Sequence, residues 1–168
     1  MTNAITVANT DWEIIDNLMD ALKGVTIEGV RVFSKVTASM SEEQALECHM
    51  KGTPVAVVIY GGTDEFVTPE DVRGCYVSAT ILVMAKKQSG VDEVGRAKEA
   101  FRLTNAAKNA VEISPPSDAS AWGDADNYHN KLEWGEPDID LTGDEGQPWI
   151  VIRLPLEIGF VLATGTSH

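Results

Sequence analysis

The sequence predicts an α+β fold, an α/β sandwich in which helices pack on one face of a single mixed, largely antiparallel β-sheet. Helical and strand-like segments interleave in the order α-β-α-β-β-α-β-β, without the regular βαβ alternation of a doubly wound parallel sheet. The last segment, residues 149–162, places an apolar side chain at every second position, which is typical of a strand with one buried face. Together these observations favour one sheet with one helical layer.

Length and composition indicate a single domain spanning residues 1–168, with flexible ends at about residues 1–9 and 164–168. The 26 acidic side chains outnumber the 13 basic ones and give a net charge of −13, which disfavours sequence-specific binding of nucleic acid. No apolar run reaches the ~18–20 residues of a membrane span, and the first residues lack a signal-peptide pattern. We therefore expect a soluble intracellular protein in which Cys48 and Cys75 are free thiols.

The first helix is predicted over Thr10–Lys23, where apolar residues recur at helical spacing. Thr10 and Glu13 have the spacing of a capping box, in which each side chain bonds a backbone N–H at the helix start. Gly24 is expected to end this helix in a left-handed conformation. Residues 27–37 then alternate in the manner of a strand.

A second capping box, Ser41 with Gln44, predicts a short helix that runs through Met50. Residues 55–60 form a continuous, mostly β-branched apolar run, which is typical of a strand covered on both faces. The pair Gly61-Gly62 that follows is expected to end this strand.

Residues 63–73 are a polar excursion, and a longer strand is predicted over residues 75–85. The longest helix is predicted over residues 92–113, ahead of two prolines that stop it. One apolar stripe comprises Val94, Ala97, Phe101, Thr104 and Val111, with Ala100, Leu103, Ala107 and Ala110 beside it, and the small residues indicate close packing against a sheet.

The remaining chain is predicted to hold two strands separated by a connector. Residues 114–127 form a loop, residues 128–134 alternate as a short strand, and residues 135–148 form a turn-rich acidic connector before the last strand. Pro155 has no backbone N–H, so this last strand is expected to lie at a sheet edge or to be bulged there.

The motifs of enzyme chemistry are missing from the sequence. There is no phosphate-binding glycine loop, no nucleophile elbow and no zinc-binding H-E-x-x-H motif. Cys48 and His49 are neighbours, and His129 lies near Asp126, but neither pair has the third, orienting group that catalysis requires. We expect no catalytic residue, no cofactor and no resident metal.

Residues 138–144 resemble part of a calcium-binding loop. Oxygen-bearing side chains occupy positions 1, 3 and 5, and glycine occupies position 6, but Trp149 replaces the glutamate of position 12. Two interpretations remain open, a calcium site and a solvated acidic connector. The strand patterns on both sides of these residues favour the connector, because a calcium loop of this type lies between helices.

Charge is unevenly distributed along the chain. Six of the 13 basic residues lie between residues 86 and 108, whereas residues 114–146 hold nine acids and one base. This segregation fits either ordinary solvated surfaces or a head-to-tail contact in which the basic helix of one subunit meets the acidic loop of the next. The candidate interface residues are Arg96, Lys98, Arg102, Lys108, Asp138, Asp140 and Asp144. Trp122, Trp134 and Trp149 are either interface anchors or part of the core.

The order and texture of the elements resemble a known family. Five elements carry the resemblance: the opening helix with Trp12-x-Ile14-Ile15-x-x-Leu18, the strands at residues 55–58 and 76–84, the alanine-rich helix at residues 97–111 and the final strand at residues 149–162. In this order they are similar to the tail terminator or tail completion (neck) proteins of bacteriophages. The resemblance covers residues 10–163 and rests on no invariant motif. The sequence departs from the family most in its long segments 63–73 and 114–148.

The resemblance implies a structural virion protein of the tail or neck, assembled in the host cytoplasm. Such proteins typically form a homohexameric ring on the last tail-tube ring, stop tube polymerisation and offer a surface for head joining. Implied partners are the subunit itself, the tail tube protein, the head–tail connector or neck protein and, in a contractile tail, the sheath protein, with DNA passing through an acidic lumen. The segment expected to dock on the tube contains Asp64, Glu65, Phe66, Asp71 and Arg73.

Two alternatives stay open at this point. One is another structural subunit of a tail or neck, such as a tube, baseplate or head–tail adaptor protein. The other is a small-ligand or calcium-binding domain that uses residues 138–144.

Overall fold

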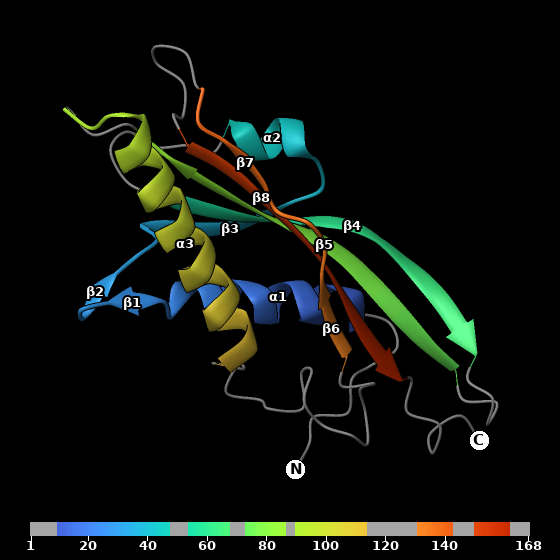
Figure 1. Ribbon diagram of the computed structural model, residues 1–168. Helices are drawn as coiled ribbons and strands as arrows, with labels where there is room; N and C mark the ends of the chain where they lie inside the picture. The colour runs from blue at the N-terminus through green and yellow to red at the C-terminus, as the bar shows by residue number, and fades with distance from the viewer. Residues whose placement is uncertain are drawn as a thin grey trace.

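The computed structural model describes residues 10–47, 54–67, 73–86, 90–113, 131–142 and 150–161. It confirms the α+β class: a mixed, mostly antiparallel sheet with helices packed against it (Figure 1). The helices are α1 (Thr10–Lys23), α2 (Glu42–Leu46) and α3 (Glu93–Ile113). The strands are β1 (Thr26–Ile27), β2 (Val30–Arg31), β3 (Lys35–Ser39), β4 (Val55–Val67), β5 (Arg73–Ala85), β6 (Lys131–Trp134), β7 (Asp138–Asp140) and β8 (Ile150–Val161). None of the helices in these ranges is long and apolar enough to cross a bilayer.

The main sheet has the order β3-β4-β5-β8-β6, with β7 also paired to β8. Only β3 and β4 are parallel, and every other neighbouring pair is antiparallel. Strands β4, β5 and β8 are 13, 13 and 12 residues long and form the centre of the sheet. The long C-terminal strand predicted from the alternating pattern is therefore confirmed as β8.

The two long helices share one face of the sheet, as expected, but α2 lies on the other face. Buried residues of α1 and α3 form one core with Ala56, Val58 and the even-numbered apolar residues of β8. Ala45 of α2 packs instead in a second, smaller cluster with residues of β4 and β5 that point the opposite way. Residues 55–59 are thus buried on both faces, which confirms the interpretation of that apolar run.

Helix α3 packs on the sheet with only part of its predicted apolar stripe. Thr104 and Val111 of that stripe are buried, but Val94 and Phe101 are 61% and 59% exposed. The neighbouring Ala100, Leu103 and Ala107 are fully buried and belong to the main core. The small alanine side chains allow close packing, and Val94 and Phe101 lie on the side of the helix that is turned away from the sheet.

The segment after α1 differs from the prediction. Helix α1 has the predicted bounds, but Gly24 is not in a left-handed conformation, and its N–H reaches the carbonyl of Asp20 at 3.3 Å. Residues 27–37 do not form one strand. Glu28 and Gly29 have φ angles of 52° and 79°, which make the tight turn of the β1–β2 hairpin, and β3 follows.

The two sequence signals around β4 have opposite outcomes. Ser41 caps α2 as predicted, because its side chain accepts a hydrogen bond from the N–H of Gln44; residues 48–50 of the predicted helix lie outside the described residues. The glycine pair does not end β4. A β-bulge between Tyr60 and Gly62 absorbs the irregularity, and the strand continues to Val67.

Pro155 lies inside the sheet and not at its edge. Its carbonyl accepts a hydrogen bond from the N–H of Gly135, which belongs to the short link between β6 and β7. In an antiparallel strand, the N–H and C=O of one residue point to the same side, which for Pro155 is the side of β6 and β7. Strand β6 pairs with residues 156–159 of β8 and β7 with residues 151–153, so the missing N–H of Pro155 lies between the two paired segments and costs no ladder hydrogen bond.

Candidate functional site

The segment proposed for tube docking is part of a long hairpin. Asp64, Glu65 and Phe66 lie on β4, Arg73 begins β5, and Asp71 is outside the described residues. The prediction of a loop over residues 63–73 was therefore wrong for its first half. We call residues 62–67 and 73–78 the β4–β5 arm. In Figure 1 both strands of this arm run past the end of α1.

The outer edge of the arm has no strand beside it within the described residues. Strand β3 pairs only with residues 55–59 of β4, so β4 is an edge strand from Tyr60 onward. Six residues at ~3.3 Å per residue make an arm of about 20 Å. Asp64 and Glu65 are exposed, and Val67 is 65% exposed near the end of the arm. Charged side chains on an open edge are the usual protection against uncontrolled strand pairing.

The four basic residues of α3 do not form one continuous basic stripe. Arg102 donates two hydrogen bonds to Glu99, and this contact raises the pKa of its guanidinium. The ammonium of Lys108 lies 5.3 Å from the ring centre of Trp134, within the range of a cation–π contact. Arg96 is half-buried, whereas Lys98 is exposed on the outer side of the helix.

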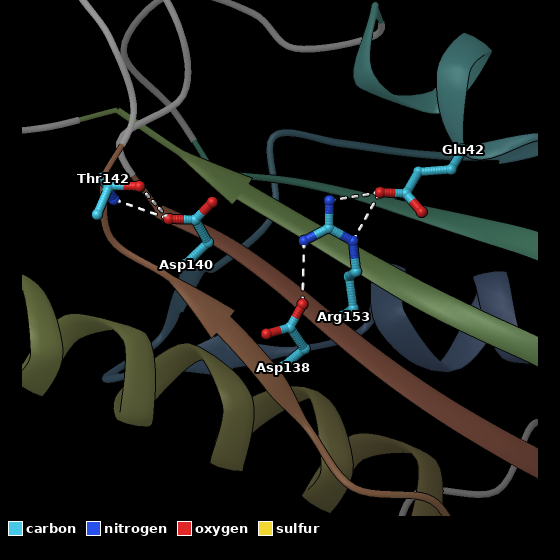
Figure 2. Close-up of polar contacts among 5 residues, drawn as sticks. All are labelled: Glu42, Asp138, Asp140, Thr142 and Arg153. Atoms are coloured by element: carbon cyan, nitrogen blue, oxygen red, sulfur yellow. Dashed lines mark hydrogen bonds and ion pairs between the residues drawn. The ribbon is translucent and has the colours of Figure 1, made fainter.

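The acidic residues near β7 are engaged with neighbours on the α2 side of the sheet. Figure 2 shows Arg153 of β8 between Glu42 and Asp138. Its Nε donates to Glu42 Oε1 at 2.6 Å, and Nη1 donates to Asp138 Oδ2 at 3.3 Å. Hydrogen bonding to Glu42 is the main reason that the pKa of Arg153 is raised. Arg153 thereby ties α2 to β7 across β8.

Asp140 has a separate partner. Its Oδ1 accepts hydrogen bonds from the hydroxyl and the N–H of Thr142, at 2.6 and 2.9 Å, and these bonds lower the pKa of its carboxyl. Asp138 and Asp140 lie on a strand paired with β8, so the part of the connector assigned to a calcium loop or a turn is in fact β7. Asp144 lies outside the described residues.

A hollow on the open face of the sheet was missed by the sequence analysis. It has a volume of about 480 Å³ and is lined by residues of β4, β5, β6 and β8 and by Gly135. Ser78 and Thr80 face the same way as Leu82, which packs against α2. Glu133 is directly opposite Glu157, and Glu157 accepts a hydrogen bond from the hydroxyl of Ser78 at 3.4 Å.

Two glycines allow the backbone to pack closely beside this hollow. A Cβ on Gly135 would meet the ring of Pro155 at 2.8 Å, and a Cβ on Gly61 would meet the carbonyl oxygen of Ser78 at 3.1 Å. The lining, as far as the chain is described, includes two carboxylates and no basic side chain. Like charges directly opposite on neighbouring strands repel each other, so this surface favours a positively charged partner.

The other residues singled out in the sequence have structural roles or are not described. Cys75 is a buried free thiol in the main core. Trp134 packs against that core and donates its indole N–H to Glu112 of α3 at 2.5 Å. The remaining ones, Cys48, His49, Trp122, Asp126, His129 and Trp149, lie outside the described residues.

No protein-family model matches the sequence, and no curated protein matches it either. The arm, the exposed side of α3 and the acidic hollow therefore carry the functional argument.

Proposed function

We propose that this protein is a structural subunit of a bacteriophage tail that caps the end of the tail tube as a ring. In this role it stops tube polymerisation and offers a surface to which the head or neck joins. The proposal rests on the resemblance in element order and, above all, on the β4–β5 arm. That arm extends an open strand edge about 20 Å along the sheet.

The arm supports capping because of its chemistry. An open strand edge binds another extended segment through backbone hydrogen bonds, with little demand on side-chain sequence. The exposed Val67 adds apolar contact near the end of the arm, and Asp64 and Glu65 restrict the edge to partners with compatible charge. A tube subunit with a free edge or an extended segment is a partner of that kind.

Ring formation requires two different complementary surfaces on each subunit. The chain offers such surfaces on opposite sides of its sheet, because α3 covers one face while the carboxylates of Asp138, Glu133 and Glu157 lie on the other. A homohexamer is the assembly that the resemblance implies. The net charge of −13 suits a lumen through which DNA slides without binding.

Particles assembled without this chain test the proposal. A tail terminator predicts overlong tails without heads, as seen by electron microscopy, and normal particles when the chain is supplied again. Complete absence of tails indicates a tube or baseplate subunit instead. Tails of normal length joined to heads contradict any capping role.

A shortened arm tests the observation on which the proposal depends. Replacing residues 65–75 by Asn-Gly joins the paired residues Asp64 and Tyr76 through a two-residue turn and keeps the sheet below it. We expect this variant to fold, as judged by circular dichroism, but to lose binding to tube ends. Unchanged binding to tube ends removes the arm from the proposal.

A further inference from the structure

The outer side of α3 carries an unusual combination of side chains. Val94, Lys98 and Phe101 follow one another at helical spacing, so they lie on one stripe. All three are exposed, and this stripe is opposite the alanine-rich side that packs on the sheet. An exposed apolar pair that flanks a single cation is a surface suited to a partner that offers an apolar contact beside carboxylates.

The hollow on the other face of the sheet has these properties. Its lining includes Pro155, which packs closely against Gly135, together with Thr80 and the carboxylates of Glu133 and Glu157. Within one chain the helix stripe and the hollow cannot meet, because the sheet separates them.

We infer that the stripe of α3 docks in the hollow of a second copy of this chain, with Phe101 and Val94 against Pro155 and Lys98 between Glu133 and Glu157. Each subunit then gives its helix to one neighbour and its hollow to the other. The contact is heterologous, and repetition of it produces a ring when the rotation closes. This inference rests on the proposed ring and identifies its subunit contact.

The docking differs from the charge pairing expected from the sequence. The sequence-based prediction paired the whole basic helix of one subunit with the acids of residues 138–144 in the next. In the structure, Arg102 and Lys108 have partners in their own chain, as do Asp138 and Asp140. Lys98 is exposed on the outer side of α3, where it can reach the carboxylates of a neighbouring subunit's hollow. A cation placed between Glu133 and Glu157 offsets the repulsion between two carboxylates on directly opposite residues.

Charge reversal across the contact provides the test, with the mass of the full-length chain measured over a range of concentrations. We expect Lys98→Glu and Glu157→Lys each to weaken self-association by at least about tenfold. An equimolar mixture of the two variants should restore it. When the variants alternate around the ring, the reversed helix of one meets the reversed hollow of the other, and each native Lys98 meets a native hollow. Lys35→Glu, a reversal at an exposed position of β3, is the matched control and should leave the mass unchanged.

The outcomes separate this inference from the proposed function. Rings formed equally well by both single variants overturn the α3–hollow contact and leave capping intact. A Glu157→Lys variant that forms rings but fails to bind tube protein also overturns it, since the hollow then receives another protein. A native chain that stays monomeric at every concentration, with and without tubes, overturns both.

Discussion

Two phenylalanines of this chain should lose very different amounts of stability when each is truncated to alanine. Phe33 is 1% exposed, whereas Phe101 is 59% exposed on the outer side of α3. Phe33→Ala removes a fully buried ring and leaves a cavity, so we expect a loss of about 3–5 kcal/mol in the free energy of unfolding.

Phe101→Ala should cost far less. Less than half of the ring leaves water on folding, which corresponds to a transfer term of about 1 kcal/mol, and no cavity forms. Alanine also has the better helix propensity by about 0.5 kcal/mol, so the net loss is about 0.5 kcal/mol.

Urea denaturation of both variants at concentrations where the chain is monomeric provides the measurement. Dilute conditions matter because association adds its own free energy to the apparent stability. A loss of about 3 kcal/mol or more for Phe101→Ala would show that this side chain faces the core after all. It would remove the helix orientation on which the inferred subunit contact depends.

Three further predictions concern local features. Glu28→Asn should raise the free energy of unfolding by about 0.5–1 kcal/mol in urea denaturation, because asparagine tolerates a φ of 52° better than glutamate; an equal loss would show that Glu28 makes a stabilising contact. Arg153→Met should lower stability by about 1 kcal/mol and Tm by about 2–4 °C, a discounted value since Arg153 is 29% exposed; an unchanged Tm refutes the tie between α2 and β7. Thr142→Val should raise the pKa of Asp140 toward its ordinary value in an NMR titration, because the hydroxyl no longer donates to the carboxylate; an unchanged pKa would contradict this cause of the lowered value. In the native chain, the contribution of this carboxylate to the free energy of unfolding is present above the unfolded pKa of 3.8 and is lost as pH falls through the lower folded pKa.

The sequence predicted those elements whose local signals and packing agree. The bounds of α1, the Ser41 cap of α2 and the one-sided apolar pattern of β8 are all confirmed, because each follows from helical apolar spacing, from a local side-chain cap or from a single buried face. The parallel pairing of β3 with β4 has no local signal, and it makes the sheet mixed.

The errors arise where tertiary packing decides between local alternatives. On α3 apolar residues extend around much of the helix, and sequence periodicity cannot choose between the side with Phe101 and the opposite side with Leu103. The glycine pair at residues 61–62 predicts the end of a strand when only the sequence is known. The bulge that lets β4 continue is defined by its pairing with β5, which the sequence does not reveal.

The acidic hollow could not be predicted for a similar reason. Glu133 and Glu157 are 24 positions apart, and only the register of β6 on β8 places them opposite each other. Gly135, beside Pro155 in space, was the available signal, but its meaning depends on that same register.

Tube polymerisation in the presence of this chain tests the central claim most directly. Purified tail tube protein is polymerised with increasing amounts of the chain, and tube lengths are measured by electron microscopy. The account predicts shorter tubes at higher ratios, with a ring of additional density at one tube end. Tube lengths that do not depend on the added chain, with bare ends throughout, would contradict it.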